Sequence, residues 1–230
     1  MPVTKRPYWI LVWLLAASPA AAEQLWLAGA EASAGGGRYA YAGLITPLGE
    51  GRLGAGWFQR AWLDWLGYTY DGADGTVRAR APGGEWALGR AWSAGATAAA
   101  LSAGAVYRDT RLTPAAADSA VAGGRWGLKL QGEARTSRPG WAGEAIASYT
   151  VGTAGYWARL RAFRRRGDHH WPGAELVVQG DPEYRAVQVG GVWGRLPAGP
   201  SAHFNLKAGL RRDASQGASG YAGVEWVWLP

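Results

Sequence analysis

Three histidines and the polar residues near them are the side chains of this chain whose types could support catalysis or metal binding. His169 and His170 follow Asp168 in the segment RRGDHHWP. Successive side chains on an extended chain point in opposite directions, so this pair does not converge on one metal ion. We interpret the segment as a turn, and the sequence predicts no metal site.

A hydroxyl and an imidazole are the groups that a hydrolase would pair as nucleophile and base. Ser148 and His203 are the candidates for such a pair. No nucleophile-elbow motif surrounds the serine, and no spacing forces the two residues together. A hydrolase or deacylase acting on lipid or glycan therefore stays open only as an alternative, and we predict no catalytic residues.

Two further polar segments are interpreted as features of turns and rims. In QGDPEYR, an aspartate before proline starts a turn and a tyrosine re-enters the next strand. In YRDTRL, charges of both signs predict an ion-pair cluster at a rim rather than a substrate site. The rim and turn candidates are Tyr107, Arg108, Asp109, Asp181, Tyr184 and Arg185. The chain has no phosphate loop or dinucleotide fingerprint, and we predict no cofactor.

Most charged residues stand in segments that alternate with apolar residues. The segment RWGLKLQGEAR is typical, since its tryptophan and leucines fall on one face and its charges on the other. In a membrane barrel the apolar face meets lipid and the charged face lines the lumen. The lumen-facing candidates are Arg60, Asp64, Arg125, Lys129, Glu133, Glu144, Arg159, Arg161, Arg165, Lys207, Arg211 and Glu225, with Glu175 as a further acid. They predict either a pore of weak anion preference or a lumen plugged by salt bridges.

Twelve strand-like segments carry this alternation. We predict strands over 24–34, 38–47, 56–70, 76–92, 96–109, 123–136, 140–151, 155–165, 173–180, 184–195, 202–212 and 220–229. Glycine-, proline- and aspartate-rich turn signals separate most of them. The uncharged stretch 91–107 is too short for a spanning helix and is interpreted as strand, turn and strand.

The composition favours a barrel over other classes. Mean hydropathy is −0.16, which excludes a polytopic helical membrane protein but not a barrel, whose strands are only half apolar. The 15 tryptophans and 10 tyrosines often fall near segment ends, as interfacial girdles require. The ending YAGVEWVW alternates aromatic residues as outer-membrane barrels do. The prediction is an all-β, antiparallel up-and-down transmembrane β-barrel of about twelve strands.

The N-terminal segment has the pattern of a cleaved export signal. A basic start and an apolar run end in small residues, with Ala20 and Ala22 placing cleavage before Glu23. Residues 1–22 are thus predicted to be a signal peptide and residues 23–230 a single barrel domain. Export without any cysteine leaves the fold without disulfides.

Topology follows from an even number of strands. Both termini are then expected on the periplasmic side of the outer membrane, with the longest outward connection at 110–122. The connection 48–55 is rather long for a periplasmic turn. Losing Lys5 and Arg6 with the signal lowers the formal charge from +7 to +5. Because the chain is exported and its arginines are spread out, we expect the bilayer, and not nucleic acid, as its partner.

Several strings, in order, resemble one known family. YAGLITPLGEGRLGAGWFQRAWLDWLGYTYDG, APGGEWALG, AGAVYRDTRLTP, RWGLKLQGE, ASYTVGTAGYWARLRAF and ELVVQGDPEYRAVQVGG together resemble the cellulose biosynthesis protein BcsS family over residues 39–195. The resemblance implies a non-enzymatic accessory of bacterial cellulose synthesis and secretion, acting as conduit, anchor or scaffold. It implies cellulose or the synthase and secretion complex as partners, and it transfers no catalytic residue. A periplasmic polysaccharide-binding β-sandwich is the remaining alternative, because alternation alone fits both folds.

Overall fold

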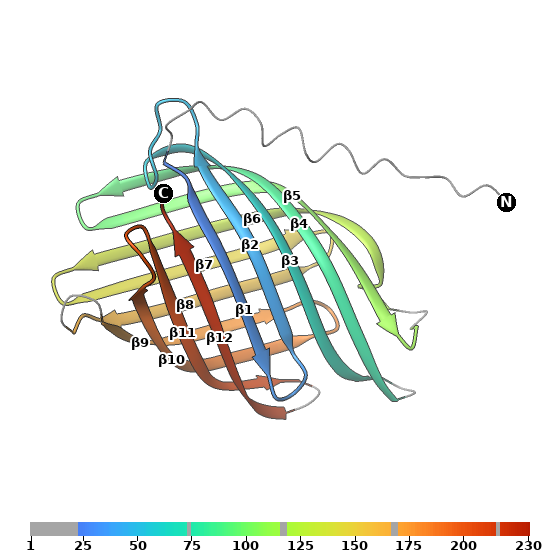
Figure 1. The fold of residues 1–230 in the computed structure, drawn as a ribbon. Coiled ribbons are helices and arrows are strands. Elements are labelled where there is room, and N and C mark those ends of the chain that lie inside the picture. Colours follow the sequence, from blue (N-terminus) through green and yellow to red (C-terminus); the bar gives the residue numbers. More distant parts are fainter. Residues whose placement is uncertain (1–22, 73–74, 116–118, 167–169, 215–216) are drawn as a thin grey trace.

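The protein is a closed barrel of twelve antiparallel strands (Figure 1). The computed structural model describes residues 23–72, 75–115, 119–166, 170–214 and 217–230. The strands are β1 (Leu25–Ser33), β2 (Arg38–Pro47), β3 (Gly56–Gly72), β4 (Gly75–Ala94), β5 (Thr97–Thr113), β6 (Gly123–Arg138), β7 (Trp141–Val151), β8 (Gly155–Arg164), β9 (Trp171–Gly180), β10 (Arg185–Pro197), β11 (Ala202–Asp213) and β12 (Gly217–Trp228). The predicted fold class and strand number are confirmed, while the predicted signal peptide lies outside the described residues.

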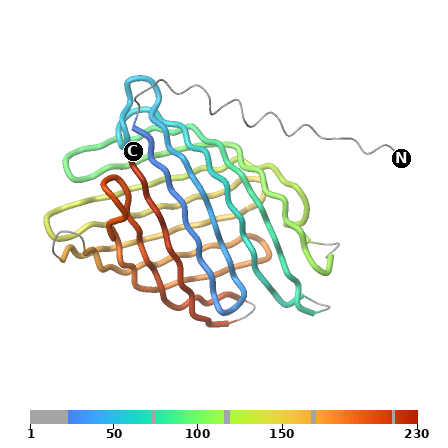
Figure 2. The backbone as a smooth tube through the Cα atoms, viewed as in Figure 1, coloured from blue at the N-terminus to red at the C-terminus, as the bar shows by residue number. Residues whose placement is uncertain are grey.

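The barrel closes where its first and last strands pair. β1 and β12 run side by side in Figure 2, and their register extends from Trp26 opposite Trp228 to Ser33 opposite Tyr221. Closure leaves no free sheet edge, which is the arrangement that a bilayer requires of strands. The alternative of two stacked sheets is therefore wrong. Helices of the length and apolarity needed to cross a membrane do not occur among the described residues.

The two ends of the barrel differ. We call the end where β1 begins and β12 ends the terminal rim, and the opposite end the distal rim. β3, β4 and β5 are the long strands, with 17, 20 and 17 residues, and they run past the β1–β2 turn at the distal rim (Figure 1). The predicted connection 110–122 is shorter than expected, because β5 continues to Thr113 before the chain turns.

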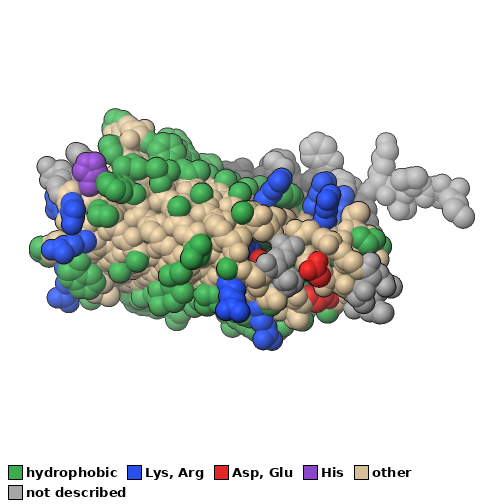
Figure 3. Space-filling view, turned by 90° about the horizontal axis from the view of Figure 1, so that it is seen from below, with side chains coloured by type: hydrophobic (Ala, Val, Ile, Leu, Met, Phe, Trp, Pro, Cys, Tyr) green, Lys and Arg blue, Asp and Glu red, His purple; other side chains and the backbone are tan. Residues whose placement is uncertain are grey.

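The outer wall is apolar and the charged side chains gather at the ends. In Figure 3 hydrophobic side chains lie along the length of the barrel, while basic side chains lie at both ends and acidic ones at one of them. The outward tryptophans include Trp57 and Trp141 towards the terminal rim and Trp126 on β6, which are 57%, 46% and 68% exposed. A closed sheet with large apolar side chains exposed all around it would make the protein aggregate in water. In a bilayer the same side chains contact lipid and stabilise the protein.

Glycines let aromatic rings lie flat against the inner wall. A Cβ atom on Gly29 of β1 would lie 2.6 Å from the Tyr41 ring, and one on Gly43 of β2 would collide with the Trp62 ring. Each glycine is next to its ring in the strand register, with Gly29 opposite Tyr41 and Gly43 opposite Trp62. The two rings stack on each other, with centroids 4.8 Å apart and planes 12° apart. Glycine covered by a neighbouring aromatic ring permits local curvature without leaving a void.

Candidate functional site

Two networks of charged side chains lie in the lumen. We define the large network as Glu31, Arg159, Arg161, Glu175, Lys207, Arg211 and Glu225, contributed by β1, β8, β9, β11 and β12. The small network is Arg60, Glu85, Lys129, Gln131 and Glu133, from β3, β4 and β6. The alternation that points leucine and tryptophan outwards necessarily points these polar residues inwards.

Glu225 is the central acid of the large network. Its two carboxylate oxygens accept hydrogen bonds from both terminal nitrogens of Arg161, at 2.6 and 2.7 Å. Arg159 donates a third bond at 3.0 Å, and Lys207 lies 3.7 Å away. β8 and β12 are separated by three strands along the wall, so these bonds cross the lumen. A bidentate pair of this kind fixes both the distance and the orientation of the two walls.

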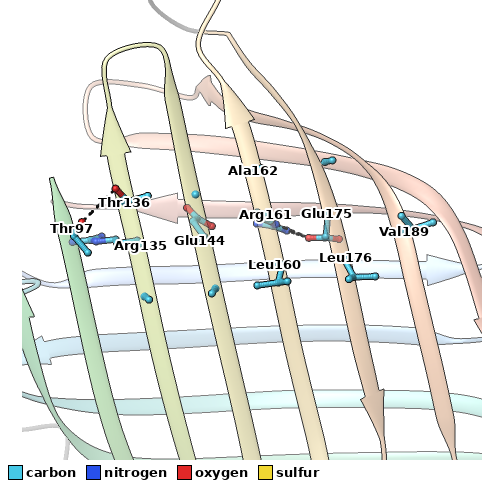
Figure 4. Close-up of a pocket in the computed structure, with 14 residues that line it drawn as sticks. Thr97, Arg135, Thr136, Glu144, Leu160, Arg161, Ala162, Glu175, Leu176 and Val189 are labelled. Carbon is cyan, nitrogen blue, oxygen red and sulfur yellow. Dashed lines mark hydrogen bonds and ion pairs between the residues drawn. The ribbon is translucent and has the colours of Figure 1, made fainter.

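Glu175 joins neighbouring and distant strands at the buried centre of the same network. Arg161 Nε donates to Glu175 at 2.6 Å, and Figure 4 shows the two side chains facing each other from β8 and β9. The Tyr221 hydroxyl donates to the other carboxylate oxygen at 3.4 Å. Glu175 is 1% exposed, so its charge is stabilised by these partners and not by bulk water.

Lys207 and Glu31 extend the network towards β1. Their charged atoms are 2.7 Å apart, and Arg211 lies 3.6 Å from the same glutamate. Gln188 of β10 also donates a hydrogen bond to Glu31. Cations and anions thus alternate around the large network, and no single sign dominates it. A charge-balanced interior gives little basis for strong ion selectivity.

The small network occupies the other side of the lumen. Arg60 forms an ion pair with Glu85 of the adjacent β4, and Lys129 Nζ is 2.8 Å from the second oxygen of that carboxylate. Arg60 also donates to Gln131 at 3.0 Å and lies 3.4 Å from Glu133. The stacked rings described above lie beside it, since the Arg60 guanidinium is 5.7 Å from the Trp62 ring centroid.

Tyrosines meet across the lumen near the distal rim. The Tyr68 and Tyr184 rings, from β3 and from the β9–β10 turn, have centroids 5.0 Å apart. Both residues are buried and form one cluster with Ala79 and Ala186. β3 and β9 lie on opposite sides of a twelve-stranded ring, so this contact spans the barrel.

The β9–β10 turn holds that contact in place. Asp181 accepts hydrogen bonds from the backbone N–H groups of Glu183 and Tyr184, at 2.8 and 2.9 Å. Glu183 accepts bonds from Ser119 and from the Ala120 amide in the β5–β6 connection. Burial raises the pKa of the Asp181 carboxyl above its ordinary value, and the hydrogen bond from Glu183 opposes that rise. The sequence-based interpretation of Asp181 as a turn residue agrees with this geometry.

The structure places the sequence-predicted candidates in several different environments. Most lumen candidates belong to the networks, and Glu144 lies at their edge, 4.0 Å from Arg159. Asp64 pairs instead with Arg108, a predicted rim residue that points into the barrel. Arg125 lies towards the distal rim, where its side chain donates to the Ala122 carbonyl.

Arg165 is the lumen candidate that the structure places elsewhere. β8 ends at Arg164, and the Arg165 amide donates to Gly140 at the terminal rim. Its side chain is exposed there, because the alternation of β8 stops where the chain turns.

The remaining rim candidates lie on outer surfaces. The centroids of the Tyr107 and Trp126 rings are 5.0 Å apart. The Asp109 carboxylate forms an ion pair with the Arg111 guanidinium, with 2.9 Å between the charged atoms. Arg185 is exposed at the start of β10. Two network acids, Glu31 and Glu85, were not among the predicted candidates, although each alternates with outward apolar residues in its strand.

The hydrolase candidates are not brought together. Ser148 lies in β7 opposite Trp157, whereas His203 lies near the start of β11 opposite Val227. Of the adjacent histidine pair, His169 lies outside the described residues. Among the residues that the structure describes, no group of three or more metal-ligating side chains occurs.

One hollow of about 560 Å³ lies along β5–β10 (Figure 4). Four alanines and one glycine line it, flanked by Leu160, Leu176 and Val189, which are exposed on the outer wall. These residues alternate with the inward Arg161 and Glu175. The hollow therefore belongs mainly to the apolar outer wall and not to the lumen.

The sequence of the whole barrel matches one family model. The model of the cellulose biosynthesis protein BcsS family covers residues 26–229. The chain belongs to the BcsS family. This confirms the resemblance and extends it to the last strands. No curated protein sequence matches this BcsS-family chain.

Solved structures of similar fold are outer-membrane barrels. The COG4313 outer membrane channel from Pseudomonas putida F1 is 8% identical to this BcsS-family chain, with a TM-score of 0.56, covering 93% of this chain and 97% of that one. The KdgM porin is 7% identical, with a TM-score of 0.51, covering 89% and 98%. At such identities the likeness concerns the fold, which is that of outer-membrane proteins.

Proposed function

We propose that this BcsS-family protein is a non-enzymatic accessory of cellulose biosynthesis and secretion that serves as an outer-membrane anchor or scaffold. The observation that supports an anchor over a conduit is the bidentate pair between Arg161 and Glu225, which joins two strands that have three others between them. A polysaccharide threading the part of the lumen that this pair crosses would have to break it. Breaking a buried pair leaves charges without partners, at a cost of about 3–5 kcal/mol.

Contacts at the distal end of the barrel support the same role. The contact between Tyr68 and Tyr184 and the bonds from the β5–β6 connection to Glu183 lie at one end of the barrel, apart from the networks. A conduit would have to open this end as well. In the proposed orientation the terminal rim faces the periplasm, where a synthase complex is accessible, and the distal rim faces outwards.

The test has a physical and a cellular arm. In planar bilayers the purified protein is expected to show no sustained channel conductance at moderate voltage, because its lumen is bridged by charged pairs. In cells, deleting the gene is expected to reduce exported cellulose while synthase activity in isolated membranes persists.

Other outcomes point to the competing functions. Sustained conductance by the wild type that is lost in variants with a narrower lumen would support a conduit. Failure of His203→Ala or Ser148→Ala to restore export, with normal membrane insertion, would support a hydrolase. Unchanged export in the deletion strain would contradict any role in secretion.

A further inference from the structure

Three arginines belong to one register row across the outer wall near the distal rim. Arg38 of β2 is opposite Gly67 of β3, Gly67 is opposite Arg80 of β4, and Arg80 is opposite Arg111 of β5. All three arginines are exposed and alternate with inward residues. Gly67 leaves a gap in the row, and the Trp65 ring reaches into it, 2.9 Å from where a Cβ would lie. We call Arg38, Arg80 and Arg111 the arginine row.

The row concentrates positive charge that the described part of the chain neutralises only in part. Arg80 and Arg111 are direct cross-strand neighbours, and like charges in that position repel each other. Arg78 adds another exposed cation two residues further along β4. Arg111 pairs with Asp109 at 2.9 Å, whereas Arg38, Arg78 and Arg80 form no ion pair with any described residue. An anion from outside the protein would relieve this repulsion.

Where the row crosses β3, its height matches the edge of a bilayer. Trp57 near the terminal rim and Gly67 at the row are ten positions apart on β3. That is about 34 Å along a strand, or about 26 Å along the membrane normal at a tilt of about 40°. The apolar band of such barrels is about 25 Å tall. On β2, β3 and β4 the outward residues just below the row are apolar, namely Ala40, Trp65 and Pro82. On β5 that position is Asp109, which pairs with Arg111. Arg38 and Arg80 are each one strand away from Gly67, so the tilt moves them by only about 3 Å from this height, and their guanidinium groups lie near the level of the lipid phosphates.

We propose that the arginine row binds the phosphate groups of a phosphorylated glycolipid of the outer leaflet, of the diphosphorylated lipid A class. Guanidinium groups bind phosphate through paired, charge-assisted hydrogen bonds. Arg38 and Arg80 are two strand spacings apart, about 10 Å, so a headgroup with a phosphate on each of two sugars can contact both ends of the row. The acyl chains would lie along Leu63 and Trp65, which are 59% and 37% exposed. The inference uses the proposed orientation of the barrel but not its role in cellulose secretion.

The test measures lipid binding by the protein purified from membranes in a zwitterionic detergent. Binding of diphosphoryl lipid A is compared for the wild type, Arg38→Ala/Arg80→Ala and the control Arg138→Ala/Arg164→Ala, whose arginines are exposed near the terminal rim. We expect the row variant to bind about tenfold more weakly or worse, because charge-assisted bonds to two phosphates are lost. The control should bind within about twofold of the wild type, and Arg80→Lys, which keeps the charge, should lose less than Arg80→Ala.

The lipid arms separate the sources of phosphate. Lipid A without phosphates should not compete for the site, and phosphatidylglycerol should compete poorly. The proposal is overturned if the row variant binds lipid A as the wild type does, if the control loses as much, or if phosphatidylglycerol binds equally well. Heat-modifiable migration of each variant checks that the barrel is folded. If the alanine variant does not fold, the lysine variant and the salt dependence of wild-type binding decide, since binding that is independent of salt overturns the proposal. Cellulose export and conductance test the proposed function separately.

Discussion

Among single residues, Glu225 is the side chain on which the arrangement of the interior depends most. It receives three hydrogen bonds from two arginines and lies near Lys207, and it is 5% exposed. Buried charges of this kind contribute less to net stability than to holding one arrangement, because their desolvation offsets much of their attraction. Losing one partner is nevertheless costly, since the others stay buried.

We expect Glu225→Gln to lower the free energy of unfolding by about 3–5 kcal/mol, because it leaves Arg159 and Arg161 without their shared counter-charge. Glu144→Gln is the matched control, since the Glu144 side chain is 40% exposed and its single pair is 4.0 Å long. That change should cost at most about 1 kcal/mol. Urea unfolding in lipid vesicles measures both. Equal, small effects would show that the large network does not hold the walls together.

Among the strands, the contacts of glycines with aromatic rings shape the wall around β1–β3. Gly43 has no space for a Cβ, because the Trp62 ring lies over it. Gly132 of β6 differs, since its nearest neighbour to an added Cβ is Leu101 at 3.4 Å, an ordinary contact. Packing therefore requires glycine at position 43 but does not require it at position 132.

We expect Gly43→Ala to displace the Trp62 ring and lower the free energy of unfolding by about 1–3 kcal/mol. Gly132→Ala should have no effect or be slightly stabilising, because alanine restricts the unfolded chain more than glycine does. The urea midpoint of refolded barrels and tryptophan fluorescence report the two changes. A similar loss for both variants would contradict the packing argument.

For the whole molecule, orientation connects both proposals. Both the anchor, which faces the synthase, and the arginine row, which faces phosphorylated glycolipid, require the same orientation. The terminal rim must face the periplasm and the distal rim the outside of the cell. The chain has no cysteine, so single cysteines can report each rim separately.

We expect Thr76→Cys, exposed at the distal rim, to react with a membrane-impermeant maleimide on intact cells. Ser201→Cys, exposed at the terminal rim, should react only after the outer membrane is permeabilised. Both proteins should label equally once the cells are opened, which controls for expression. Labelling of Ser201→Cys alone on intact cells would reverse the orientation and with it the glycolipid proposal.

The fold was predictable because its signals are local. Alternation with period two identifies strands and their two faces, and turn residues such as Asp181 act within a few positions of themselves. These signals give the number of strands, the outward tryptophans and most of the inward charges. These signals do not locate the exact end of a strand. For this reason the sequence pattern assigns Arg165 to the lumen and residues 110–113 to a connection.

The partners of the inward charges could not be read from the pattern. Arg161 meets Glu225, and Tyr68 meets Tyr184, only because closure between β1 and β12 places distant strands face to face. The stagger of the strands sets which residues share a level, and a closed ring sets which levels meet across the lumen. The same is true of the arginine row, whose members come from three strands. Alternation assigns a side chain to a face, whereas its neighbours depend on contacts between strands that are remote in sequence.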